Sequence, residues 1–273
     1  MLPWKSHEAG SAKTHDEQAK VDELSAGLGM LHGRSGKFCS SDCLRRYLRA
    51  RSWDVQKSKK MLEETLSWRE SYKPEELQWA DVAEEGETGK VYRADFFDKK
   101  GRSVLVLVPA NQNTSSCEGQ LKHLVYLMEN ALLNLPPEQE QMVWLIDFTG
   151  WSFSTAVPVK TTREVVHILQ SHYPERLGNA ILYNPPRVFG AFWKVVKHFL
   201  DCQTRQKVMF VNANNPESLR LMEELFDVDQ LSMAFGGKRV EGYDHEKNSR
   251  QMLEDDTRAS AYWELNEENI DKF

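Results

Sequence analysis

The chain has few cysteines and no long apolar run. Four of its 273 residues are cysteine, and Cys39, Cys43, Cys117 and Cys202 follow no paired spacing. That usage excludes a disulfide framework, and the absence of a second ligand pair near Cys39 and Cys43 argues against zinc. No apolar stretch approaches the ~20 residues that a membrane-spanning helix needs. We therefore expect a soluble, cytoplasmic protein with four reduced thiols and no metal.

The motifs of the common α/β enzymes are also missing. Phe235-Gly236-Gly237-Lys238 has neither the spacing of a phosphate loop nor a hydroxyl residue after its lysine. Gly27, Gly29 and Gly33 are wrongly spaced for a dinucleotide-binding turn, and no Gly-x-Ser-x-Gly or His-Glu-x-x-His motif occurs. Asp147 ends an apolar run, where a local capping role is the simpler interpretation. We expect no catalytic residues and no cofactor.

Charge is unevenly distributed along the chain. Residues 241–273 hold ten acidic side chains against four basic ones, which accounts for the whole formal net charge of −6. Residues 43–60 hold seven basic side chains and a single acid, Asp54, so a local basic face is expected. That face is either a solvated helix surface or a docking patch. Because the rest of the body is neutral, we expect no nucleic-acid partner.

The amino-terminal part of the sequence divides into two segments. Residues 1–36 are polar, and we expect a loose, partly disordered leader with at most one short helix near 17–28. Residues 37–85 show apolar residues at helical spacing, with Asp54 as the N-cap between two helices and Pro74 at the start of another. This segment is predicted to be a small all-helical module. At the other end, residues 246–273 form an acidic tail that we expect to be mobile.

In residues 86–245, short strand-like apolar runs alternate with segments whose apolar residues recur at helical spacing. Short runs rich in β-branched and aromatic residues are found at Val91–Phe97, Val104–Val108, Val143–Phe148, Ala180–Tyr183 and Val208–Val211. Helical patterns lie between most of them, one starting at a Ser115–Glu118 capping box and another covering residues 187–200. Parallel strands buried on both faces read as such continuous runs. The alternation predicts an α/β fold with a largely parallel mixed sheet covered by helices.

Two charged residues stand among these apolar runs. Glu175 lies in Tyr173-Pro174-Glu175-Arg176-Leu177-Gly178, and Lys207 directly precedes an apolar strand. Charges placed in such surroundings must pair with each other or with a polar ligand, because burying either alone is costly. The residues by themselves favour a salt bridge that ties a turn to a strand.

Several motifs occur together in a fixed order. They are Leu44-Arg45-Arg46-Tyr47-Leu48-Arg49-Ala50-Arg51, Trp68-Arg69, Tyr173-Pro174-Glu175-Arg176-Leu177-Gly178, Phe199-Leu200-Asp201 and Phe235-Gly236-Gly237-Lys238. With this set the chain resembles the CRAL-TRIO family over residues 40–245, and in particular its Sec-fourteen-like phosphatidylinositol-transfer branch. The resemblance implies that 86–245 is the lipid-binding domain, with a sheet flooring a lipid cavity that a mobile gate helix closes.

The resemblance also implies a headgroup site and a gate. The site would comprise Arg51, Glu175, Arg176, Thr204 and Lys207, in which cationic groups hold the phosphodiester and the carboxylate accepts from inositol hydroxyls. Ser52 departs from the family pattern, since close relatives often have a second basic residue there. The gate helix would present Phe189, Phe192, Trp193 and Val196 to the cavity, although the same apolar pattern fits a fully buried core helix.

The function implied is non-enzymatic binding and intermembrane transfer of phosphatidylinositol, with phosphatidylcholine as the exchange ligand. Such a protein would be a monomer that visits a membrane surface transiently, as a peripheral protein of the cytoplasm. Two alternatives are a carrier of a neutral isoprenoid or retinoid such as tocopherol, and a non-catalytic adaptor. The Glu175 and Lys207 charges argue against the neutral cargo.

Overall fold

The computed structural model describes the backbone of residues 6–264 and the side chains of residues 15–264. The chain forms two compact units. The first holds the described residues up to Lys73 together with residues 263–264, and the second holds Pro74–Tyr262. Residues 1–5 of the predicted leader and 265–273 of the predicted tail lie outside the described part. The helical module was predicted to run to residue 85, whereas the boundary between the two units falls after Lys73.

The first unit is built from four helices. They are α1 (Ser6–Leu28), α2 (Gly33–Phe38), α3 (Ser41–Ala50) and α4 (Val55–Tyr72). The Ser40 hydroxyl accepts from the Cys43 N–H to cap α3, and the Asp54 carboxylate accepts from the Lys57 N–H at 3.0 Å to cap α4. These caps satisfy amides that a helix start leaves without partners. The Asp54 cap was predicted from the sequence and is confirmed.

The prediction of a loose leader is wrong for its described part. The α1 helix is 23 residues long, and the side chains of Val21 and Leu24 are 2% and 0% exposed in the core of the first unit. That core also contains the apolar faces of α3 and α4, including Tyr47 and Leu62. A long polar helix with a narrow apolar stripe owes its stability mainly to tertiary packing, which composition does not reveal.

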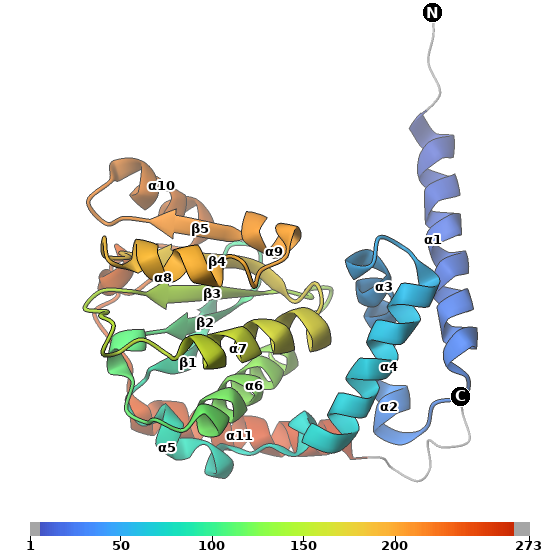
Figure 1. Cartoon of the computed structure of the whole chain (residues 1–273), viewed down its shortest axis with the longest axis horizontal. Helices are drawn as coiled ribbons and strands as arrows, with labels where there is room; N and C mark the ends of the chain where they lie inside the picture. Colours follow the sequence, from blue (N-terminus) through green and yellow to red (C-terminus); the bar gives the residue numbers. More distant parts are fainter. Residues whose placement is uncertain (1–5, 265–273) are drawn as a thin grey trace, which may run out of the picture. The chain divides into compact units, whose positions relative to one another are not determined.

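The second unit contains the sheet, with strands and helices alternating along most of its length (Figure 1). Its elements are η1 (Pro74–Glu76), η2 (Trp79–Asp81), α5 (Ala83–Gly86), β1 (Val91–Phe97), β2 (Ser103–Leu107), η3 (Pro109–Asn111), α6 (Cys117–Leu133), β3 (Met142–Asp147), α7 (Val159–His172), β4 (Leu177–Tyr183), α8 (Phe189–Val196), α9 (Cys202–Gln206), β5 (Val208–Val211), α10 (Pro216–Leu225), η4 (Met233–Phe235) and α11 (His245–Trp263).

The five strands lie in the order β1-β2-β3-β4-β5. β1 pairs with β2 in the antiparallel sense, and the other neighbours are parallel, with Leu145 opposite Ile181 in the β3–β4 pair. Short apolar strands joined through helices favour this arrangement, since parallel neighbours need a crossover connection. The predicted α/β fold with a largely parallel mixed sheet is confirmed.

Alternate residues of the strands face two different environments. Val143, Leu145, Ile181 and Tyr183 contribute to a packed core that also contains residues from α10 and the segment after it, such as Phe226. Their neighbours in sequence point the other way because side chains alternate along a strand. On that second face Trp144, Ile146, Ala180, Leu182 and Val208 line a cavity. The sheet therefore has a packed hydrophobic core on one face and a cavity on the other.

Two helices differ in detail from the sequence prediction. α6 is capped by Ser116, whose hydroxyl accepts from the Gly119 N–H at 3.0 Å, and not by Ser115. Gly119 lies against the Glu85 carboxylate, where a Cβ would collide with Oε1. The predicted helix 187–200 is regular only over the eight residues of α8 and continues as turns to Phe199.

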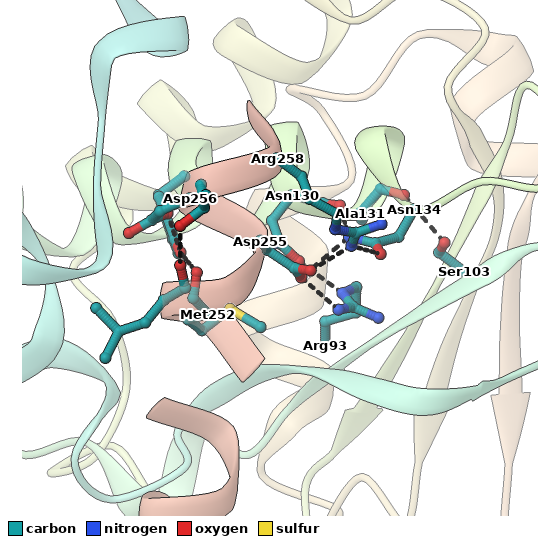
Figure 2. Close-up of polar contacts among 12 residues, drawn as sticks. Arg93, Ser103, Asn130, Ala131, Asn134, Met252, Asp255, Asp256 and Arg258 are labelled. Atoms are coloured by element: carbon teal, nitrogen blue, oxygen red, sulfur yellow. Dashed lines mark hydrogen bonds and ion pairs between the residues drawn. The ribbon is translucent and has the colours of Figure 1, made fainter. Parts of the chain in front are cut away.

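The expectation of a mobile acidic tail is wrong for residues 246–264. α11 has 19 residues, and Met252 and Asp255 are 0% and 3% exposed. The Asp255 carboxylate accepts from Arg93 and Asn130 at 2.6 and 2.9 Å. Figure 2 shows these bonds together with those from Asn134 and Arg258. Burial opposes the charge of this carboxylate, but the hydrogen bonds from Arg258 and Asn130 and the Arg93 charge hold the pKa of Asp255 below its ordinary value.

None of the helices within residues 6–264 combines the length and apolar character that crossing a bilayer demands.

Candidate functional site

A cavity of about 190 Å³ lies between the sheet and the helices that cover this face. Its floor is the second face of the sheet, and one side is α7, which contributes Val165, Val166 and Leu169. Thr162 and Thr204 are the two lining residues that carry a hydroxyl group, and the remaining lining side chains are apolar or aromatic. A space with these walls suits hydrocarbon and excludes charged groups from its interior.

Another wall is α8. Phe189, Phe192, Trp193 and Val196, the four predicted gate residues, all line the cavity. Phe189 packs against Phe148 with ring centroids 4.4 Å apart, and the rings of Trp151 and Phe192 are 5.6 Å apart.

Polar contacts contribute little to the attachment of α8. Within the described residues no side chain of α8 forms a hydrogen bond or an ion pair, so aromatic and aliphatic contacts hold the helix over the cavity. An element attached in this way can leave without stranding a buried polar partner.

Glu175 and Lys207 meet beside this cavity. The Lys207 Nζ lies 3.4 Å from the Glu175 Oε2, and the two side chains are 24% and 21% exposed. Glu175 comes just before β4 and Lys207 just before β5, two parallel neighbours joined by the Ala180 N–H to the Lys207 carbonyl. The pair therefore lies at the amino-terminal edge of the sheet. Leu177, two residues after Glu175, and Val208, directly after Lys207, line the cavity.

The backbone at Glu175 is strained. Its φ is +59°, in the left-handed region, and the turn is closed by the Arg176 N–H donating to the Tyr173 carbonyl at 3.2 Å. A residue with a Cβ in this conformation costs about 1 kcal/mol, and such residues cluster at functional sites. The turn directs the carboxylate to the Lys207 ammonium rather than along the strand.

Thr204 belongs to the same segment as Lys207. It lies in α9, its carbonyl accepts from the Lys207 N–H at 3.1 Å, and its side chain reaches the cavity wall. Its hydroxyl donates to the Asp201 Oδ2 at 3.1 Å, while its N–H donates to the Asp201 Oδ1 at 2.6 Å. The structure thus groups Glu175, Thr204 and Lys207, with the Thr204 hydroxyl engaged by the cap of α9.

The two predicted arginines each donate to a backbone carbonyl. The Arg176 guanidinium donates to the Glu140 carbonyl at 2.9 Å, ahead of β3. Arg51 is the C-cap of α3 in the first unit, and its Nη1 donates to the Ala50 carbonyl at 3.1 Å. Arg176 directly follows Glu175 in the chain. The roles of Arg176 and Arg51 in headgroup binding stay predictions.

Other residues of the Tyr173–Gly178 motif have structural contacts. The Tyr173 hydroxyl donates to the Glu129 carboxylate at 2.6 Å. Gly178 lies against the Arg102 side chain, which is buried and bonded to Asp98, so that a Cβ at this position would collide with it. The motif is therefore needed for folding as well as for placing Glu175.

Sequence reasoning missed Gln170 on α7. Its Nε2 donates to the Phe199 carbonyl at 3.2 Å, and its Oε1 accepts from the Asp201 N–H at 2.8 Å. A neutral amide on a helix face carries no pattern that would reveal this contact. The strand-end residue Asp147, by contrast, accepts from the Thr149 N–H at 2.8 Å, in line with the local capping role expected for it.

Comparison with known proteins assigns the chain to a family. Residues 86–237 match the CRAL/TRIO domain, and residues 13–64 match the CRAL/TRIO N-terminal domain. Because the first match alone covers more than half of the chain, the protein belongs to the CRAL/TRIO family of lipid-binding proteins, as its motifs predicted. The amino-terminal match includes much of α1 and thus agrees with the packing of that helix in the first unit.

Alignments with two related proteins cover most of this chain. The chain is 38% identical over 213 residues to the CRAL-TRIO domain-containing protein C23B6.04c of Schizosaccharomyces pombe, a match that covers 78% of the chain and 20% of that relative. It is 32% identical over 237 residues to the phosphatidylinositol transfer protein PDR17 of Saccharomyces cerevisiae, covering 82% and 65%. The chain thus spans between a fifth and two thirds of these relatives.

A solved structure supports the fold. The crystal structure of Sfh5 superimposes with a TM-score of 0.64, covering 94% of this chain and 97% of that one, at 19% sequence identity. At such identity the likeness concerns the fold alone.

Proposed function

We propose that this protein binds a phospholipid, phosphatidylinositol, with its acyl chains in the cavity and its headgroup beside Glu175 and Lys207, and carries it between membranes. The observation that supports this most is the position of that ion pair, next to residues that line an apolar cavity. The ammonium of Lys207 would hold the phosphodiester, and the carboxylate of Glu175 would accept from inositol hydroxyls. The identity of PDR17 as a phosphatidylinositol transfer protein supports the choice of lipid.

The proposal requires no chemical step. Burial of each acyl methylene is worth ~0.8 kcal/mol, so a two-chain lipid leaves a membrane readily only for an equally apolar space. The carrier offers that space, exchanges phosphatidylinositol for phosphatidylcholine at a membrane surface, and departs as a loaded monomer. Its place in the cell is then the cytoplasm, with peripheral and transient attachment to membranes.

Loading depends on movement of α8. The cavity of about 190 Å³ is smaller than the ~300–1,000 Å³ of sites that enclose drug-sized ligands, so two acyl chains need the wall displaced. α8 is the wall held by apolar contacts, and such contacts can be exchanged for lipid contacts at a membrane.

The outer side of this region is suited to a membrane surface. Val188 and Val195 are 52% and 46% exposed, and Phe210, whose ring packs against Trp193 of α8, is 49% exposed. Arg187 and Lys194 are exposed on the same segment, where they can meet anionic headgroups. Contact of this surface with a bilayer would open α8 directly onto the lipid.

The test is transfer of labelled phosphatidylinositol from donor to acceptor vesicles. We expect the full chain to accelerate transfer and Lys207→Ala to abolish that acceleration. Lys100→Ala, which removes an exposed lysine from the turn between β1 and β2, is the matched control and should transfer normally. Normal transfer by a folded Lys207→Ala protein would refute the headgroup site.

A neutral isoprenoid or retinoid is the second candidate cargo, and the apolar lining of the cavity favours it. Native mass spectrometry of the purified protein separates the two, because a copurifying phospholipid and a copurifying isoprenoid differ in mass. A protein that retains no lipid under any loading condition would instead be an adaptor.

A further inference from the structure

The segment between α8 and α9 is held by one side chain. Gln170, in the last turn of α7, donates its Nε2–H to the Phe199 carbonyl at 3.2 Å and accepts the Asp201 N–H with its Oε1 at 2.8 Å. The residue between these two, Leu200, lines the cavity. One amide group therefore bonds both flanks of a cavity residue at the point where the α8 wall ends.

The end of α7 and the turn that follows it together hold both ends of α9. Asp201 caps the amino end of α9 through the N–H and hydroxyl of Thr204, and Lys207 follows the last helical residue and reaches Glu175. Gln170 and Glu175 lie five residues apart, at the end of α7 and in the turn after it. α9, which carries Thr204, is therefore attached at one end through Gln170 and at the other through Glu175.

We propose that Gln170 is the latch of the α8 wall, a positioning residue that controls how fast lipid enters and leaves. This inference rests on the proposed function and adds a residue that sets the rate of lipid exchange. Among the residues that the structure describes, the α8 side chains form no hydrogen bond or ion pair, so the bonds from Gln170 to residues 199 and 201 are the side-chain attachment that follows α8 most closely in the chain. Opening α8 pulls on this segment and requires the Gln170 bonds to break.

The latch is chemically specific to an amide. It needs a donor for the Phe199 carbonyl and an acceptor for the Asp201 N–H on one planar group, and glutamine supplies both. Gln170→Glu preserves shape and the acceptor but loses the donor, and it sets a second carboxylate close to Asp201. Gln170→Ala removes both bonds. Gln206→Ala is the matched control, since Gln206 is exposed on α9 and its amide donates to the Cys202 sulfur, at 3.8 Å, away from residues 199 and 201 in the chain.

The experiment measures uptake and release of labelled phosphatidylinositol by the full chain in vesicle suspensions. We expect Gln170→Ala to accelerate both rates about tenfold, as the loss of two ordinary hydrogen bonds predicts, and to leave the ratio of the rates within about twofold. Gln170→Glu should accelerate both rates as well, and Gln206→Ala should behave as wild type. If release rises while affinity falls in proportion, Gln170 contacts the lipid and is no latch.

A second measurement is independent of lipid. Hydrogen exchange of the lipid-free protein should show about tenfold faster exchange in residues 197–206 of Gln170→Ala, with the sheet unchanged. Unchanged exchange there overturns the latch. A wild-type protein that neither binds nor moves phospholipid overturns the proposed function instead, and the exchange result then still decides whether Gln170 holds this segment.

Discussion

Arg93 on β1 and Asp255 on α11 are 162 positions apart in the chain and form a buried ion pair, with 2.6 Å between Nη2 and Oδ2. Both side chains are almost completely buried, and the carboxylate has further bonds from Asn130 and Asn134. The pair attaches the carboxyl-terminal helix to the edge of the sheet (Figure 2). Buried charges are stable only when their partners are all present.

Asp255→Asn should therefore destabilise the protein. The substitution leaves the Arg93 guanidinium buried without its counter-charge, and we expect a loss of about 3 kcal/mol in the free energy of unfolding. Urea unfolding followed by circular dichroism measures it. The neighbouring Glu254→Gln, on the exposed side of α11, is the control and should stay within about 0.5 kcal/mol of wild type. Equal stability of the two variants would show that the ion pair does not hold α11.

Acid should weaken a second attachment, between β1 and the carboxyl-terminal part of the second unit. The Asp95 carboxylate accepts from both Nη atoms of Arg239, at 2.5 and 2.8 Å, and from Lys247 at 2.8 Å. Hydrogen bonds from Arg239, against a smaller opposing effect of burial, hold the pKa of Asp95 far below its ordinary value.

Because the folded-state pKa is the lower one, this contribution to stability is complete above the unfolded pKa of about 3.9 and disappears as pH falls below it. We expect the unfolding free energy to decrease between about pH 4 and pH 2, and Asp95→Asn to decrease less over that range. Urea titrations at a series of pH values would measure both proteins. Parallel pH profiles of the two would contradict the assignment.

The fold was predictable because its signals are local. Each strand is a short apolar run, and the Asp54 cap and the Pro74 start are read from neighbouring residues. The leader and the tail were predicted wrongly for the opposite reason. Leu24 is buried by residues of α3 and α4, and Asp255 by Arg93, and nothing near either residue in the sequence announces those partners.

The site was predictable to the extent that burying charge is costly. Glu175 and Lys207 attract notice because each needs a partner, and the structure places them together. Arg176 came from the family motif; its guanidinium donates to the Glu140 carbonyl, and its role in headgroup binding stays a prediction. Gln170 could not be found from the sequence, because a neutral amide at a half-exposed helix position incurs no such cost.

The Phe235–Lys238 motif should be structural rather than ligand-binding. A Cβ at Gly237 would collide with the backbone carbonyl of Leu231, which cannot move aside as a flexible side chain can. We expect Gly237→Ala to lower the unfolding free energy by about 2 kcal/mol. Lys238→Ala, which removes an exposed ion pair with Asp229, should change stability little. Thermal unfolding of both variants tests this prediction. A larger loss of stability in Lys238→Ala than in Gly237→Ala would contradict it.

The outer face of α8 should matter for membrane exchange and not for folding. Val195 is 46% exposed, so Val195→Asp can keep its carboxylate in water in the closed protein and should lower the unfolding temperature only slightly. At a bilayer, however, the new carboxylate would have to be desolvated beside anionic headgroups, and we expect vesicle-to-vesicle transfer to fall about tenfold.

Val240→Asp provides the control for this prediction, because Val240 is 81% exposed in the same unit and lies outside the α8 surface. It should transfer lipid as wild type does. The decrease for Val195→Asp should shrink when the vesicles contain only zwitterionic lipids, since repulsion by anionic headgroups is then lost. Equal transfer by the two variants on anionic vesicles would mean that the protein approaches membranes through another face.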